Sequence, residues 1–169
     1  MRSVCLRLHV PNQPASDVYA TLADFGRYPE LCEAVRSVTI TERSGNRTVS
    51  AWEVTFRAGL LRWTEEDTFD PAALSITFRQ LDGDIAVFEG SWQCLDRQCL
   101  DWQGQDAAAG GTEIVFNARL DMGIPSLADA LEPIAARTLT DNIVSIVRGL
   151  VGHADLIESD VAVPARSAQ

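Results

Sequence analysis

The chain has 169 residues, is 46% hydrophobic and carries a formal net charge of −10 at pH 7. This length and composition fit one globular domain with a single core, whereas the acidic balance excludes a nucleic-acid-binding or anionic-membrane-binding surface, because both need a basic footprint. All 14 basic side chains are arginine, which excludes Schiff-base chemistry through a lysine amine.

The first part of the chain predicts one strand followed by two short helices. Residues 3–10 alternate apolar and polar side chains, which is typical of a strand. Pro11 and Pro14 end this pattern, because proline interrupts strand pairing. Residues 16–22 and 25–32 then predict two short helices.

Six further strands are predicted in the middle of the chain, joined by short connections rich in glycine, asparagine and aspartate. They cover residues 35–42, 49–57, 61–69, 74–81, 85–95 and 112–120. Such short connections specify consecutive antiparallel hairpins.

The last substantial element is a long helix. Residues 126–153 show helical periodicity, with Ser126 as the expected N-cap. A seven-stranded antiparallel sheet must curl around this helix to bury the helix's apolar face. The sequence therefore predicts a single α+β domain over residues 1–157, followed by a flexible tail over residues 158–169.

The N-terminal segment and the hydropathy pattern predict a cytoplasmic, soluble protein with no membrane partner. The first residues alternate in polarity and lack the uninterrupted apolar run of a signal peptide, and no segment reaches the roughly 18 apolar residues of a membrane span.

The cysteines and histidines point to neither a metal site nor a cofactor. His9 and His153 lie at opposite ends of the chain. The cysteines lack C-x-x-C spacing and a nearby histidine, so we interpret them as reduced thiols while a disulfide stays open. They are Cys5, Cys32, Cys94 and Cys99.

The segment 61–70 carries the candidate site. As a strand it places Trp63, Glu65, Asp67 and Phe69 on one face. An apolar face interrupted by acids suits a pocket better than a dry core, because a dry core would have to desolvate both carboxylates. The two acids lie two residues apart, so their Cα atoms are ~6.5 Å apart and both side chains enter the same pocket.

The acidic pair suggests general acid–base chemistry. Two carboxylates in a poorly solvated cavity repel each other, so one takes a raised pKa and stays protonated near neutrality while the other stays charged. Glu65 and Asp67 would then provide an acid and a base. The alternative is that they face solvent, or that Arg57 or Arg62 neutralises them in a structural salt bridge.

Other candidate residues are aromatic or polar. Phe88, Trp92 and Phe116 are expected either to wall the pocket or to belong to an ordinary core. On the long helix, one stripe begins apolar and becomes small and polar at Thr138 and Asn142, which suits the roof of a cavity.

Strand alternation alone aims Arg79 away from the interior, because Ile76, Phe78 and Gln80 share the opposite phase. An inward Arg79 would need a β-bulge or a mixed lining. Both orientations stay open at this point.

An ordered set of residues and the order of elements support a resemblance over residues 3–150. The set is Tyr28-Pro29-Glu30-Leu31, Trp63, Arg79, Gly90-Ser91-Trp92, Gly110-Gly111-Thr112-Glu113, Asp121-Met122 and Asn142. The chain thereby resembles the helix-grip fold of the START-like (SRPBCC) superfamily, and within it the bacterial polyketide aromatase/cyclases. Coenzyme Q binding proteins are similar more distantly.

The resemblance implies a cavity for a polyketide or another hydrophobic small molecule, with possible delivery by an acyl carrier protein and a possible homodimer. It implies Tyr28 at the pocket mouth, Trp63 and Trp92 as walls, Phe116 in the pocket, and Arg79 as a group that engages polar atoms of the ligand.

The resemblance also implies an activity of the lyase type, used in antibiotic biosynthesis: cofactor-free aldol ring closure and dehydration of a poly-ketone. Glu65 and Asp67 would transfer protons while Arg79 or Asn142 polarises a carbonyl. The chain departs from many aromatase/cyclases at Asp67 and Val35, where those proteins carry a basic residue and a tyrosine. The alternative function is a non-catalytic carrier of a quinone, fatty acid or polyprenyl lipid.

Overall fold

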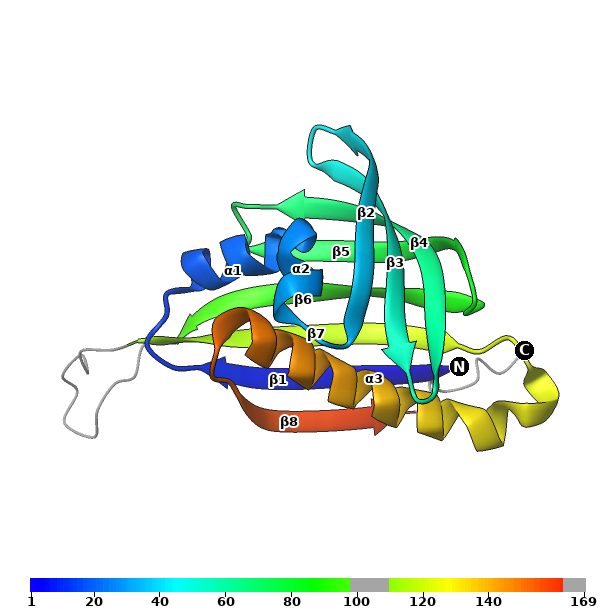
Figure 1. The fold of residues 1–169 in the computed structure, drawn as a ribbon. Helices are drawn as coiled ribbons and strands as arrows, with labels where there is room; N and C mark the ends of the chain where they lie inside the picture. Colours follow the sequence, from blue (N-terminus) through cyan, green and yellow to red (C-terminus); the bar gives the residue numbers. More distant parts are fainter. Residues whose placement is uncertain (98–109, 163–169) are drawn as a thin grey trace, which may run out of the picture.

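The computed structural model describes residues 1–97 and 110–162. Cys99 and Trp102, in the predicted last hairpin, lie outside these residues. Eight strands form one antiparallel sheet in the order β2-β3-β4-β5-β6-β7-β1-β8 (Figure 1). Their bounds are β1 (Arg2–Val10), β2 (Val35–Ser44), β3 (Arg47–Phe56), β4 (Gly59–Asp70), β5 (Ser75–Gly83), β6 (Val87–Arg97), β7 (Gly111–Asp121) and β8 (Asp155–Ala162).

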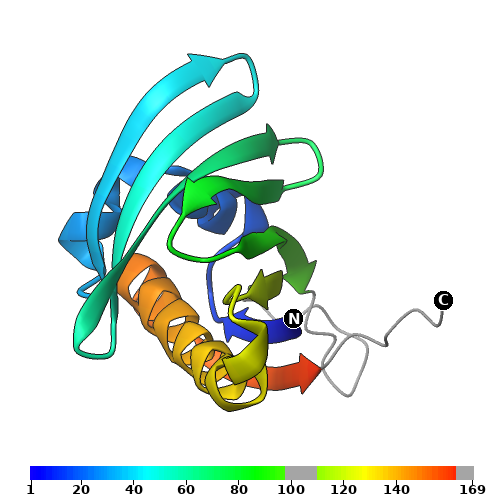
Figure 2. The ribbon, with the colours of Figure 1, turned by 90° about the vertical axis from the view of Figure 1, so that its right-hand side faces the viewer.

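The helices lie on the concave side of the sheet. After β1 come α1 (Ala15–Ala23), a 3₁₀ turn (Phe25–Arg27) and α2 (Tyr28–Leu31), and after β7 come a second 3₁₀ turn (Pro125–Leu127) and α3 (Ala128–Val151). Figure 2 shows the sheet curling around α3. This arrangement is the predicted helix-grip fold. The long helix begins at Ala128 rather than at Ser126, because the 3₁₀ turn occupies the preceding residues.

The predicted count of seven strands is wrong by one. The eighth strand, β8, pairs with β1 in antiparallel register. Residues 158–162 therefore belong to the sheet rather than to a flexible tail, and residues 163–169 lie outside the described part. All residues of β8 are exposed, so this strand has no buried face that could produce the alternation by which strands are predicted.

Alternation in the strands builds the core as predicted. Val4, Leu6, Leu8 and Val10 of β1 are fully buried, and they pack with the apolar residues of α1 and α3 in one cluster. The buried faces of β3 to β7 continue this surface towards α3, where the interior is not completely filled.

Gly149 sets the distance between α3 and α2. A Cβ atom at this position would clash with the carbonyl oxygen of Leu31 and lie 3.3 Å from Sγ of Cys32. The same contact brings the Cys32 thiol to the carbonyl oxygen of Ile146 at 3.5 Å. Glycine here lets the last turns of α3 approach the backbone of α2.

Replacing Gly149 with alanine therefore tests the packing of α3. Alanine favours a helix by about 1 kcal/mol over glycine, but the clash with Leu31 should reverse the sign and lower the free energy of unfolding by about 1–3 kcal/mol. Denaturant unfolding measures this change. Ser145→Ala, at an exposed position of α3, is the control and should be neutral or stabilising; a stabilised Gly149→Ala variant would contradict the packing argument.

Candidate functional site

A cavity of about 100 Å³ lies between the concave face of the sheet and α3. Its lining is almost entirely apolar, and aromatic side chains dominate it. The lining residues are Phe25, Tyr28, Trp52, Val54, Phe56, Leu61, Trp63, Glu65, Asp67, Phe78, Ile85, Phe88, Trp92, Phe116, Leu120, Met122, Ala135, Leu139, Asn142, Ile143 and Ile146.

The cavity has an inner end and a mouth, which differ in exposure. Glu65 and Asp67 are only 6% and 1% exposed, so they lie at the inner end. Phe56, Leu61 and Leu139 are half-buried and lie where the connection between β3 and β4 approaches α3. We interpret this more exposed end as the mouth of the cavity.

Two carboxyl groups therefore share the inner end of the cavity, as the alternation of β4 predicts. Among the described residues neither has a salt-bridge partner, because Arg62 pairs with Glu53 at 2.8 Å instead. Burial raises the pKa of Glu65 well above its ordinary value, and the charge of Asp67 and a hydrogen bond between the two carboxyls raise it further. Burial raises the pKa of Asp67 to about 6, although hydrogen bonds from Glu65 and Ser50 oppose this effect.

Two tryptophans and a serine direct their hydrogen-bond donors towards the carboxyl pair. The Trp52 indole N–H donates to Oγ of Ser50 at 2.8 Å, and the Ser50 hydroxyl donates to Oδ2 of Asp67 at 2.8 Å. The Trp63 indole N–H donates to Oε2 of Glu65 at 2.6 Å. An indole N–H can only donate, so both chains of hydrogen bonds run towards the carboxyl groups.

The pKa shifts of the two carboxyls, rather than these hydrogen bonds, indicate which one carries the proton. Within the described residues, Oδ1 of Asp67 receives no hydrogen bond from an amide, indole or hydroxyl group. A hydrogen bond between two carboxyls requires one proton, and Glu65 holds its proton more tightly. Near neutral pH, the larger upward shift of the Glu65 pKa favours Glu65 as the protonated donor and Asp67 as the charged acceptor.

The aromatic rings around the pair form a continuous network. Trp52 and Trp63 stack with centroids 6.1 Å apart and an interplanar angle of 3°. Trp63 meets Phe88 edge to face at 5.5 Å, and Trp92 lies 4.6 Å from Phe116. The rings predicted as walls therefore line the cavity, and their role in binding a ligand stays a prediction.

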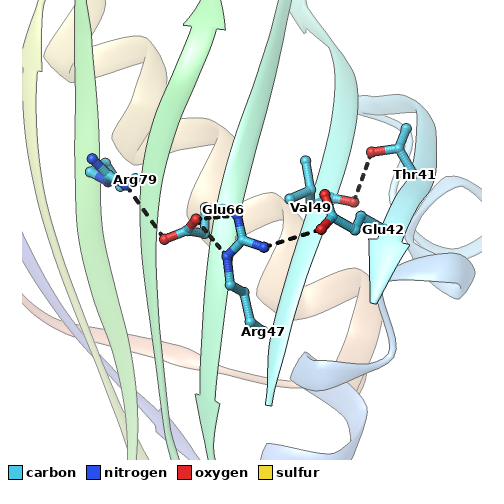
Figure 3. Close-up of polar contacts among 6 residues, drawn as sticks. All are labelled: Thr41, Glu42, Arg47, Val49, Glu66 and Arg79. Atoms are coloured by element: carbon cyan, nitrogen blue, oxygen red, sulfur yellow. Dashed lines mark hydrogen bonds and ion pairs between the residues drawn. The ribbon is translucent and has the colours of Figure 1, made fainter. Parts of the chain in front are cut away.

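Arg79 does not face the cavity, so the orientation implied by the resemblance is wrong. Its side chain is 62% exposed and lies 3.4 Å from Oε1 of Glu66. Figure 3 shows Arg79, Glu66, Arg47 and Glu42 in one network on the outer face of the sheet. Strand alternation predicted this outward orientation, because β5 carries no bulge at Arg79 where it pairs with Glu66.

Two further expectations, for Thr138 and Phe69, need correction. Thr138 lines a separate outer depression beside Arg57 and Arg137 rather than the cavity, because it lies at the edge of the helix face that carries Ala135 and Asn142. Phe69 packs against Phe25 with centroids 5.5 Å apart and does not line the cavity.

Tyr28 lines the cavity but does not lie at the mouth that the resemblance implies. It is buried, and its hydroxyl donates to the carbonyl oxygen of Leu22 at 2.5 Å. Asn142 does lie near the mouth, where its amide donates to the carbonyl oxygen of Thr55 at 3.0 Å and links α3 to β3.

Ser50 and Trp52 are connected to the carboxyl pair by hydrogen bonds, although the sequence analysis did not include them in the candidate site. A signal was available: Ser50 and Trp52 share one face of β3, and hairpin pairing sets Ser50 opposite Glu65 and Trp52 opposite Trp63. A serine on an apolar face needs a hydrogen-bond partner, which Asp67 provides.

No group of three histidine, cysteine, aspartate or glutamate side chains within residues 1–97 and 110–162 is arranged to hold a metal ion. Among the helices of that same part of the chain, none combines the length and apolar character needed to cross a membrane.

Comparison with known proteins shows the family and the fold. A family profile described as polyketide cyclase / dehydrase and lipid transport matches residues 11–146. No curated protein sequence matches the chain.

Solved structures share the fold. TTHA0849 from Thermus thermophilus is 24% identical with a TM-score of 0.75, over 89% of this chain and 94% of that one. The ZhuI aromatase/cyclase from Streptomyces sp. R1128 is 19% identical with a TM-score of 0.72, over 90% and 93% of the two chains. A START superfamily protein from Mycobacterium smegmatis is 13% identical with a TM-score of 0.65, over 90% and 96%.

The raised pKa of Glu65 predicts how stability depends on pH. The unfolded chain releases this proton near the ordinary pKa of 4.5 whereas the folded protein retains it, so rising pH favours unfolding of the natural protein. The Glu65→Gln side chain stays neutral and can still accept from Trp63 and donate to Asp67. The melting temperature of this variant minus that of the natural protein should therefore increase from about pH 5 to about pH 8.

Glu66→Gln, one residue away on the outer face, is the matched control with the opposite sign. The pKa of Glu66 is lowered by Arg47 and Arg79, so its charged form contributes stability that is lost as pH falls. This variant should be less stable than the natural protein at neutral pH, with a difference that shrinks in acid. Parallel pH profiles for the two variants would contradict the assignment of Glu65.

Proposed function

Because the chain belongs to the polyketide cyclase/dehydrase and lipid transport family, we propose that it closes and dehydrates a ring in a poly-ketone held beneath α3. The observation that carries this proposal is the pair of buried carboxyl groups, Glu65 and Asp67, in the lining of an otherwise apolar cavity. A base with a pKa near the working pH and an adjacent acid are what an aldol reaction requires.

The proton transfers follow from a charged Asp67 next to a protonated Glu65. The carboxylate of Asp67 removes a proton from a methylene group between two ketones, and the resulting enolate attacks a second carbonyl carbon of the same chain. The new alkoxide takes the proton of Glu65, which gives a β-hydroxy ketone. A second proton abstraction and protonation of the hydroxyl then release one water molecule, so no oxidant, reductant or cofactor is consumed.

The remaining residues would hold the substrate. Trp63, Phe88 and Trp92 offer flat surfaces that favour planar enol forms. Asn142 has one amide hydrogen beyond the bond to Thr55, which could orient a carbonyl at the mouth. The poly-ketone would arrive as a thioester on an acyl carrier protein.

A non-catalytic lipid carrier is the second candidate, favoured by the apolar lining of the cavity. A volume of about 100 Å³ is below the roughly 300–1,000 Å³ of common ligand pockets, so a long lipid, like an extended poly-ketone, would require the sheet and α3 to separate. Native mass spectrometry of protein purified from its own host distinguishes the two functions. A stoichiometric retained lipid would favour the carrier, whereas an empty protein favours the enzyme.

Kinetics with a synthetic tri-β-keto thioester test the catalytic proposal. The natural protein should accelerate formation of a ring product that has lost one water, detected by mass spectrometry. Asp67→Asn should lower kcat by about 100-fold or more because the base is lost, and Glu65→Gln should lower it because the acid is lost.

Glu66→Gln is the matched control and should retain activity, since this side chain points to the outer face. Melting temperatures would verify that each variant is folded. The catalytic proposal is wrong if folded Asp67→Asn and Glu65→Gln proteins both form product at the natural rate.

A further inference from the structure

The inner end of the cavity offers hydrogen-bond acceptors that no described protein group fills. A carboxylate has about four acceptor positions. The Ser50 hydroxyl donates to Oδ2 of Asp67, and no amide, indole or hydroxyl group of the described residues donates to Oδ1. Asp67 is 1% exposed, so bulk water does not reach it. Among the described residues that line the cavity, none is basic, and a buried charge with open acceptor positions is costly.

The size of the cavity limits which ligands can donate a hydrogen bond to these acceptors. An apolar cavity of about 150 Å³ holds one benzene ring, and the cavity here is about 100 Å³. Flat aromatic side chains flank this space, including Trp63, Phe88 and Trp92. The whole cavity therefore has room for no more than one planar ring, and a longer ligand would extend beyond it at the mouth near Leu61 and Leu139.

We propose that the inner end of the cavity binds a single planar ring bearing a hydroxyl group, a phenol or a cyclic enol, whose O–H donates to Asp67. The inference rests on the proposed function, because it assigns the ligand chemistry of the same cavity. It goes further by predicting that the site recognises the enolised or aromatised ring itself, not only an extended ketone chain.

The carboxylate of Asp67 selects ligands that carry a hydroxyl group, and the aromatic side chains of the lining select ligands with a planar ring. A methyl ether of the same ring keeps the aromatic contacts but has no proton to donate, so Oδ1 and Oδ2 of Asp67 would face an ether oxygen and repel it. A hydrogen bond to a charged acceptor separates the two ligands by roughly tenfold or more in affinity.

Calorimetric titration with phenol, anisole, toluene and benzylamine tests this selection without requiring turnover. At about pH 7.5, where Asp67 is charged, phenol should bind roughly tenfold or more tightly than anisole or toluene. At about pH 5 the preference for phenol should decrease, because Asp67 becomes protonated. This second measurement uses the natural protein and does not depend on the folding of any variant.

Asp67→Asn should reduce the preference for phenol over anisole, and Glu66→Gln should leave it unchanged. Equal affinities for phenol and anisole in the natural protein would overturn the inference, as would tighter binding of benzylamine, which would indicate a site for cations. Phenol selection without conversion of the tri-β-keto thioester would count against the catalytic proposal alone. Conversion without phenol selection would count against this inference alone.

Discussion

Burial of two carboxyl groups among tryptophan rings is the constraint on which the interior of this protein depends. Removing two charges from water costs several kcal/mol for each ion unless they are paired. The protein lowers this cost by keeping one proton on Glu65 and directing hydrogen bonds from Ser50 and Trp63 to the pair. The register of β3 against β4, which sets Ser50 opposite Glu65, thus determines the hydrogen bonds of the carboxyl pair as well as the fold.

The fold places neighbouring residues of β4 in opposite environments. Glu65 enters the cavity and has a raised pKa, whereas Glu66 joins arginines on the outer face and has a lowered pKa. The sheet curls around α3, so its inner face is shielded from water while its outer face is solvated (Figures 1 and 2). One strand therefore carries both a buried carboxyl with a raised pKa and an ion pair on the outer face.

Strand alternation predicted more of the site than the family resemblance did. The phase of β4 placed Glu65 and Asp67 inward, and the phase of β5 placed Arg79 outward, against the role that the resemblance implies. The resemblance supplied the fold and the cavity. Neither approach predicted β8, because its residues are all exposed and its pairing with β1 joins distant parts of the chain. The Ser50 hydrogen bond needed the register of two strands, which single-strand patterns do not contain.

The central claim is that the buried pair holds one proton near neutral pH. Carbon-13 NMR of the side-chain carboxyl groups, recorded across a pH titration, measures this directly, with Glu66 on the outer face as an internal reference. The account predicts that the pair titrates in two steps, one with an apparent pKa of about 6 dominated by Asp67 and one at higher pH dominated by Glu65. If both inner carboxyls instead titrate at or below their ordinary values of 3.8 and 4.5, the account is contradicted.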